Sequence, residues 1–187
     1  MVATEAFWQA SDLFERADVR EAAWYACYTR VNQEKKVARL LTTKRVEHYL
    51  PLIDRARQWA DRKKVIPWPL FPSYIFVRVP AERFDTVLTV SGVANIVRID
   101  GKPSPISGDE IRNIAQFAER LSRLGLEPAA EPFEAGQRVR ITSGPFDGLE
   151  GVVVERRGRK RVLVGLPSIR VGFEVDVGKS ALRPIDI

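Results

Sequence analysis

The sequence predicts an α+β protein in which an antiparallel sheet with helices is followed by a small all-β barrel. Two observations lead to this prediction. The apolar residues of 24–121 alternate between strand and helix spacing in the order βαββαβα, which an antiparallel sheet with helices on one face accommodates. Residues 136–187 contain eight glycines between short apolar runs and show no helical spacing, a pattern typical of a small barrel.

The 187 residues are enough for two small domains, each with its own core. We expect a first domain over residues 23–123 and a second domain over residues 134–187. Residues 124–133 contain glycine and proline without a regular period and predict a linker. Residues 1–22 mix acidic and apolar side chains, and we assign this N-terminal tail no role.

The first third of the predicted sheet domain contains two strands and a helix. Residues 24–29 are rich in aromatic side chains and predict a strand. Residues 33–45 place apolar side chains on one helical face, with Asn32 as the expected cap. Residues 47–50 predict a second strand, which ends at the proline that follows.

Basic residues and prolines mark the middle of the domain. Residues 55–64 hold five basic residues and Trp59, and they predict an exposed hairpin or loop. The three prolines of residues 67–72 argue against regular structure there, because proline lacks an amide donor and fixes φ. Residues 73–79 predict an apolar strand, and residues 82–90 predict a short helix.

A strand, a turn and a long helix complete the domain. Residues 94–99 predict the strand, and Asp100-Gly101 supplies the turn. The helix is expected to begin at Ser107 or Gly108, where two acidic residues in the first turn suit the helix dipole. Its predicted buried stripe consists of Ile111, Ile114, Ala115, Ala118 and Leu121.

Composition argues against an enzyme and against a membrane span. The longest run without a charge has 13 residues and three prolines, whereas a span needs roughly 20 apolar residues. A single cysteine, Cys27, excludes an internal disulfide and a cysteine-based metal cluster and fits a reducing cytosol. A single histidine, His48, removes most metal-hydrolase and triad chemistries. We therefore expect no catalytic residue, no metal, no cofactor, no secretory signal and a cytoplasmic location.

Positive charge is concentrated in the two predicted domains. The chain has 30 basic and 24 acidic residues, a net charge of +6. Residues 1–23 carry a net −3, residues 24–130 a net +7 and residues 136–187 a net +4. Basic domains attract polyanions by counterion release, so nucleic acid is one expected partner; the alternative is that the charge serves solubility alone.

The segment from Gly136 to Val153 runs from an alternating strand through a Gly-Pro turn into a second strand. This segment resembles the KOW motif of the NusG family and of some ribosomal proteins, which implies an SH3-like barrel. The first domain is similar to a NusG N-terminal domain in the Trp24-Tyr25 start of its first strand and in the run Pro69-Leu-Phe-Pro-Ser-Tyr-Ile-Phe-Val77. That run is especially similar to specialised paralogues of the RfaH and UpxY types. The resemblance covers about residues 23–187.

The resemblance implies a transcription elongation or antitermination factor that binds RNA polymerase and modulates pausing or termination. In the family, a hydrophobic pocket on the first domain grips the clamp helices of the largest polymerase subunit. Carried over to this sequence, the pocket consists of Tyr25, Tyr28, Phe71, Tyr74 and Phe76. Aromatic anchors suit such a surface. For Phe76 a plain core position is an equal alternative.

The resemblance also implies contact with the exposed non-template DNA strand through the start of the first helix. Here that region supplies Arg30, Gln33, Lys36 and Arg39. Cations on a rigid element can hold phosphate, and glutamine can bond to a base edge. A solvated helix face is the alternative. Val31 and Leu40 stand where the specialised paralogue has a basic residue and a histidine, which argues against recognition of the same DNA element.

For the barrel, the resemblance implies a partner surface for a ribosomal protein or the termination factor Rho. The corresponding residues are Phe146, Leu149 and Ile169. Leu149 and Ile169 replace aromatic residues of the family, which speaks against Rho and leaves the ribosomal protein open. The glycines of this segment predict a permanent barrel rather than a helical form, because each glycine costs about 1 kcal/mol in a helix.

One alternative function remains at this stage. A ribosomal or RNA-binding structural protein also uses a KOW barrel, but it has no need of the aromatic pocket on the first domain. A monomer is the default expectation for either function. The sequence does not indicate the target operons.

Overall fold

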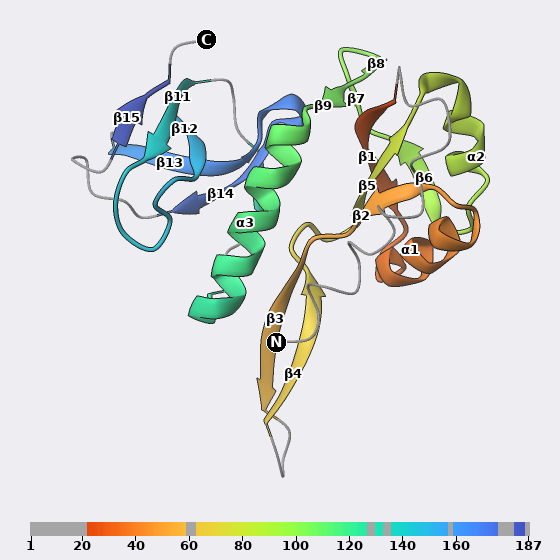
Figure 1. The fold of residues 1–187 in the computed structure, drawn as a ribbon, viewed down its shortest axis with the longest axis horizontal. Helices are drawn as coiled ribbons and strands as arrows, with labels where there is room; N and C mark the ends of the chain where they lie inside the picture. Colours follow the sequence, from red (N-terminus) through yellow and green to blue (C-terminus); the bar gives the residue numbers. More distant parts are fainter. Residues whose placement is uncertain are drawn as a thin grey trace. The chain divides into compact units, whose positions relative to one another are not determined.

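A computed structural model describes residues 22–58, 63–126, 130–132, 136–156, 159–175 and 182–185. The chain divides into two compact units, residues 1–107 and residues 108–187 (Figure 1). The first unit contains β1 (Ala23–Thr29), α1 (Glu34–Thr43), β2 (Glu47–Tyr49), β3 (Leu52–Gln58), β4 (Lys63–Pro69), β5 (Tyr74–Val79), η4 (Ala81–Arg83), α2 (Phe84–Leu88), β6 (Val93–Ile96), β7 (Arg98–Ile99), β8 (Lys102–Pro103) and β9 (Pro105–Ile106).

The central sheet of the first unit is antiparallel, as predicted. Its strands lie in the order β2-β5-β1-β6, and β9 also pairs with β1. The apolar strands β1 and β5 occupy its middle and pair over six residues, from Ala23 opposite Val79 to Tyr28 opposite Tyr74. This register decides which aromatic side chains meet, because residues directly opposite one another point to the same face of a sheet.

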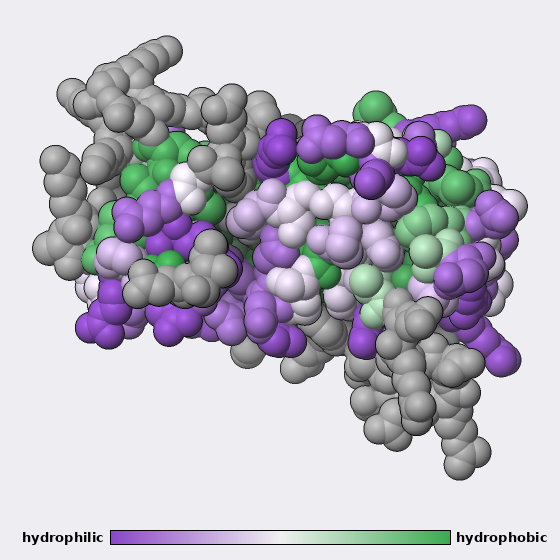
Figure 2. Space-filling view, turned by 90° about the horizontal axis from the view of Figure 1, so that it is seen from above, coloured by the Kyte–Doolittle hydropathy of each residue, from purple (hydrophilic) through white to green (hydrophobic). Residues whose placement is uncertain are grey.

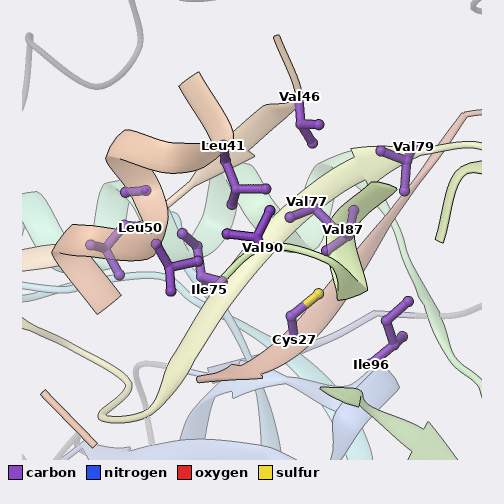
Figure 3. Close-up of a cluster of buried hydrophobic side chains, with 12 residues drawn as sticks. Cys27, Leu41, Val46, Leu50, Ile75, Val77, Val79, Val87, Val90 and Ile96 are labelled. Atoms are coloured by element: carbon purple, nitrogen blue, oxygen red, sulfur yellow. The ribbon is translucent and has the colours of Figure 1, made fainter. Parts of the chain in front are cut away.

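The helices α1 and α2 cover one face of this sheet, and the hydrophobic core of the unit lies between the sheet and these helices (Figure 3). Residues at alternate positions of β1 and β5, among them Cys27, Ile75 and Val77, are fully buried there. The helix α1 contributes Val37 and Leu41 at the predicted spacing, both fully buried. Burial raises the pKa of the Cys27 thiol to about 12, so the group stays protonated at neutral pH.

The predicted cap of α1 is wrong by one residue. Gln33 occupies the N-cap position, and no side chain caps the helix by a hydrogen bond. Asn32 instead adopts a positive φ of 59° in the preceding turn, a conformation that asparagine tolerates better than most residues. The turn brings the backbone N–H of Gln33 to the carbonyl of Arg30, 3.1 Å away.

The expectation of irregular structure over residues 67–72 is wrong for residues 67–69, because Pro67 and Pro69 belong to β4, and is confirmed for residues 70–72, which form a bend and a turn. This strand pairs only with β3, and the two form a long ribbon that reaches away from the central sheet (Figure 1). Proline is tolerated at a sheet edge. The backbone nitrogens of the two prolines are two residues apart, so they point to the same edge of the strand. This is the edge away from β3, and neither proline therefore removes a hydrogen bond of the ladder. The hairpin prediction for residues 55–64 is confirmed, while Trp59 and Arg62 lie outside the described residues.

The second unit consists of one helix and a sheet. Its elements are α3 (Gly108–Leu124), β10 (Ala130–Pro132), β11 (Gln137–Ile141), β12 (Glu150–Arg156), β13 (Arg159–Leu166), η5 (Pro167–Ile169), β14 (Val171–Val175) and β15 (Leu182–Pro184). The strands form one antiparallel sheet in the order β10-β14-β13-β12-β11-β15, which we call the KOW sheet. The prediction of a small all-strand region is confirmed. Part of the expected linker, residues 130–132, is strand β10 and pairs with β14.

The helix α3 belongs to the second compact unit. Its buried stripe contains Phe117 in place of the predicted Ala115, which is only half-buried. The Phe117 ring lies 5.6 Å from the ring of Phe146 and 5.5 Å from that of Phe173, measured between centroids. The domain boundaries expected from the sequence place this helix in the first domain. Those boundaries stay a prediction.

Polar contacts also hold α3 against the KOW sheet. The side-chain amide of Asn113 donates to the carbonyl of Glu150 at 2.8 Å and accepts from its N–H at 3.0 Å. The Glu110 carboxylate accepts from the backbone N–H of Ser168 at 3.0 Å and from its hydroxyl at 2.8 Å. Helix and sheet are therefore joined by directed bonds as well as by apolar packing.

We expect Asn113→Ala to destabilise the second unit by about 1–3 kcal/mol, because two backbone groups of Glu150 lose their partner. Unfolding by urea, followed by circular dichroism, measures the change. Gln116→Ala, an exposed position on the same helix, is the control and is expected to leave the midpoint unchanged. Equal urea midpoints for Asn113→Ala and Gln116→Ala would contradict the stabilising role given to the Asn113 hydrogen bonds.

Stability is expected to fall when the pH drops below about 6.5, through His48. Its side chain is buried, its Nδ1–H donates to the Val46 carbonyl at 2.9 Å, and desolvation lowers its pKa from 6.5. The unfolded chain therefore binds the proton more readily than the folded chain. One pH unit below 6.5 the loss reaches at most about 1.4 kcal/mol. Urea midpoints at pH 7.5 and 5.5 should differ more for the wild type than for His48→Gln; a larger difference for the variant rejects the prediction.

Candidate functional site

Two tyrosines meet at the end of the β1–β5 pair. Tyr28 and Tyr74 are directly opposite one another, their ring centroids are 4.9 Å apart and their hydroxyl oxygens are 3.4 Å apart. Tyr28 is 40% exposed and Tyr74 is half-buried. Burial is the main cause that raises the pKa of Tyr74, and its contact with Tyr28 raises it further. Tyr74 is therefore a neutral phenol at physiological pH, with apolar surface and a polar end.

Two phenylalanines lie behind this tyrosine pair. Phe71 and Phe76 are almost completely buried, and their rings pack edge to face with centroids 5.7 Å apart. The ring of Phe71 also lies 6.4 Å from that of Tyr74. The structure thus brings four of the five predicted pocket residues together, and two of the four are buried supports. The complete burial of Phe76 agrees with the alternative that it is a core residue.

Tyr25 does not join this cluster. It lies opposite Val77 in the sheet and packs against the buried core under α1 and α2, on the other face from Tyr28. Its ring meets Phe84 edge to face at 4.8 Å. The reason is the two-residue period of a strand, which sends positions 25 and 28 to opposite faces.

A tight turn between Phe71 and Tyr74 positions the second tyrosine. Ser73 has a positive φ of 65°, and the N–H of Tyr74 donates to the Phe71 carbonyl at 3.2 Å. The Ser73 N–H donates to the carboxylate of Glu34 at 2.8 Å. Glu34 is only 5% exposed, and sequence reasoning missed it. The sign of its role in the sequence is that Glu34 is the single acidic residue of a helix whose other charged residues are basic.

The predicted nucleic-acid residues lie at the start of α1 and on its exposed side. Arg30, Lys36 and Arg39 are exposed, while Gln33 is half-buried beside Gly92. Figure 2 shows hydrophilic residues, in purple, over much of one described face of the molecule. Three exposed cations on one rigid helix and its preceding turn can contact phosphates, whereas Gln33 has less freedom to reach a base.

The predicted partner residues of the KOW sheet are buried. The exposed fractions are 6% for Phe146, 0% for Leu149 and 4% for Ile169. Within the second unit, α3 contacts this region: Phe117 packs on Phe146, and Arg120 donates to the Asp147 carbonyl. The expected open partner surface is therefore covered in this structure.

None of the described helices combines the length and the apolar character that a membrane span requires. The described parts of the chain also contain no group of three or more histidine, cysteine, aspartate or glutamate side chains placed to hold a metal ion.

The fold defines a class of two-unit protein, in which an α+β unit that carries the tyrosine pair precedes a unit of one helix and an antiparallel sheet. Comparison with known families makes the class specific. The family described as "Transcription termination factor nusG" matches residues 22–115, and the KOW motif matches residues 135–164. The chain belongs to the NusG family.

Curated relatives extend over most of the chain. The transcription termination/antitermination protein NusG of Thermus thermophilus is 30% identical, with 82% of this chain and 94% of that protein aligned. The protein of the same name from Deinococcus radiodurans is 28% identical over 84% of this chain and 97% of its own length. Among solved structures, one that concerns the domain interaction in Thermotoga maritima NusG is 25% identical, covers 90% of this chain and 100% of its own, and has a TM-score of 0.44.

Proposed function

We propose that this protein is a transcription elongation or antitermination factor that binds RNA polymerase and modulates pausing or termination. Family membership supports the general function. The observation that carries the mechanism is the contact between Tyr28, which is exposed, and Tyr74, which is half-buried, at the end of the β1–β5 pair. The protein acts in the cell interior, where its polymerase is found, and needs no catalytic residue of its own.

The tyrosine pair provides the polymerase contact, and the clamp helices of the largest subunit are its partner. Two rings in mutual contact present apolar area without the loss of much side-chain freedom, since Phe71 packs near Tyr74 and is itself packed against Phe76. Their hydroxyl groups remain able to bond to polar groups at the rim of a helical partner. Tyr25 supports this surface from the other face of the sheet rather than by contact.

The basic residues of α1 supply a second contact, to the non-template DNA strand beside the polymerase. Arg30, Lys36 and Arg39 bind phosphates, and the affinity for DNA falls as salt is added because bound counterions are released. Phosphate contacts carry no sequence information. These cations therefore do not indicate whether the protein belongs to a specialised paralogue group. That assignment depends on which target it acts on.

The KOW sheet serves a second partner, for which a ribosomal protein fits better than Rho. Such a partner competes with α3 for Phe146, because the Phe117 ring packs against it with centroids 5.6 Å apart. The monomer is the proposed working state for both contacts.

Affinity for purified core RNA polymerase tests the proposal. We expect Tyr28→Ala and Tyr74→Ala each to lower the affinity of the full chain by about 30- to 100-fold, the lower end of the range for hot-spot residues. Leu88→Ala is a matched control, since Leu88 is 39% exposed in the same unit, close to the 40% of Tyr28. Biolayer interferometry measures the affinities, and thermal unfolding checks the fold.

Unchanged affinity in both tyrosine variants rejects the proposed contact. If the full chain does not bind polymerase at all but binds ribosomes or structured RNA, the alternative of a ribosomal or RNA-binding protein that uses its KOW sheet replaces this function.

A further inference from the structure

A buried acid connects the first helix to the tyrosine pair. Among the residues that the structure describes, Glu34 is the one acidic side chain that is buried, with 5% of its surface exposed. It lies in the first turn of α1, and its carboxylate accepts a hydrogen bond from the backbone N–H of Ser73 at 2.8 Å. The two residues are 39 positions apart in the chain, so the bond joins two separate elements. A carboxylate is costly to bury without such a bond.

Ser73 occupies the third position of the tight turn from Phe71 to Tyr74. The N–H of Tyr74 donates to the Phe71 carbonyl at 3.2 Å, Pro72 is second in the turn, and Ser73 has a positive φ of 65°. Proline in second place and a positive φ in third place are the features of a type II turn, in which the third residue is usually glycine. Serine is strained in this conformation, because its Cβ lies too close to the following carbonyl oxygen. The turn therefore needs a restraint that a glycine turn does not need.

The two hydrogen bonds of the Ser73 backbone supply this restraint. Its N–H is held by Glu34, and its carbonyl accepts from the N–H of Thr29 at 2.8 Å. Thr29 directly follows Tyr28, and Ser73 directly precedes Tyr74. Because the two tyrosines lie opposite one another at this end of the β1–β5 pair, a shift of Ser73 would change how their rings meet.

The helix dipole alone does not account for the burial of Glu34. An acid in the first turn of a helix benefits from the dipole even when water surrounds it. Asp85 in the first turn of α2 is such a residue, since it is exposed. Glu34 is instead buried and bonded to one N–H of another element.

We propose that Glu34 is a positioning residue for the polymerase contact: its carboxylate holds Ser73 in the strained turn and so keeps Tyr74 against Tyr28. The inference rests on the proposed function for the identity of the partner, whereas the positioning itself is a property of the free chain. Loss of Glu34 reduces the fraction of molecules in which the tyrosine pair is ready to bind, and the apparent affinity falls by that fraction.

Two measurements on the full chain test this role. Nuclear Overhauser effects between the rings of Tyr28 and Tyr74 report their contact in the free chain, and biolayer interferometry gives the affinity for core RNA polymerase. We expect Glu34→Ala to weaken the ring contact and to lower the affinity about 5-fold or more, the effect of one lost hydrogen bond, but not beyond the loss in Tyr74→Ala. Glu34→Gln keeps an acceptor oxygen without the charge and is expected to lie between the wild type and Glu34→Ala. Asp85→Ala is the matched control and is expected to change neither quantity.

Rescue by glycine separates positioning from a general structural role. Ser73→Gly removes the strain at the positive φ, so alone it is expected to change the affinity little. The double variant Glu34→Ala/Ser73→Gly is expected to recover most of the ring contact and of the affinity that Glu34→Ala loses. Thermal unfolding checks the fold of each variant. If Glu34→Ala does not fold, Glu34→Gln with and without Ser73→Gly gives the same comparison.

Unchanged ring contact and affinity in a folded Glu34→Ala variant overturn the proposal. A loss that Ser73→Gly does not restore also overturns it, because the acid then acts through another part of the chain. If the wild type does not bind polymerase, the proposed function fails, while a ring contact that is lost in Glu34→Ala and restored by Ser73→Gly still supports the positioning of Tyr74 by Glu34.

Discussion

Phe117→Ala is expected to destabilise the second unit by about 3–5 kcal/mol, the range for a large aromatic side chain removed from a core. Phe117 is fully buried, and its ring contacts those of Phe146 and Phe173. Loss of the ring leaves a cavity between α3 and the KOW sheet, and the rest of the buried stripe must then hold the helix together with the bonds of Asn113 and Glu110. Urea unfolding gives the stability, and hydrogen exchange of the α3 amides shows whether the helix separates first.

Gln116→Ala provides the comparison, since Gln116 is exposed next to Phe117. A loss below about 1 kcal/mol for Phe117→Ala, with slow exchange throughout α3, contradicts the packing described for this helix. Faster exchange of α3 with the KOW sheet still protected supports a further consequence: a partner that needs Phe146 can reach it when the helix leaves.

Gly165→Ala is the second large expected effect, and it acts within the KOW sheet. Gly165 on β13 lies directly opposite Gly172 on β14. A Cβ added at position 165 would come within 2.3 Å of both the Gly172 Cα and the Val171 carbonyl oxygen. Backbone atoms cannot yield as a flexible side chain does, so the two strands must separate. We expect a loss of about 3 kcal/mol or more, above the usual cost of overpacking.

Gly108→Ala is the matched control in the same unit, because an added Cβ there would meet only the Arg112 side chain at 3.4 Å. Thermal unfolding followed by far-ultraviolet circular dichroism compares the two variants. If Gly165→Ala unfolds at the temperature of the wild type, β13 and β14 are not as close as described.

The elements with a strong period could be predicted from the sequence. The apolar residues of β1 and β5 and the helical spacing of α1 lie where the patterns placed them, because burial on one face leaves a clear mark in each case. The turn at Asp100-Gly101 is also confirmed, with positive φ at both residues.

The candidate site was only partly predictable. The separation of Tyr25 from Tyr28 could have been found from strand parity, since positions three apart face opposite sides. The contact of Tyr28 with Tyr74 could not, because it depends on the register of β1 against β5, which no local pattern contains.

Two other features depend on tertiary structure. The prolines of β4 are compatible with a strand only because that strand has a partner on one side, and the sequence does not show how many partners a strand has. Burial of Phe146 likewise depends on α3, because the Phe117 ring that packs on it lies 29 positions earlier in the chain.

We infer that this protein changes transcript elongation through its tyrosine pair. Single-round transcription by the cognate RNA polymerase, on a template with a defined pause, is the decisive experiment. The full chain is expected to change the pause half-life, and the Tyr28→Ala/Tyr74→Ala double variant at the same concentration is expected to leave it unchanged. An identical half-life with and without wild-type protein, at a concentration that saturates the polymerase, would contradict the claim.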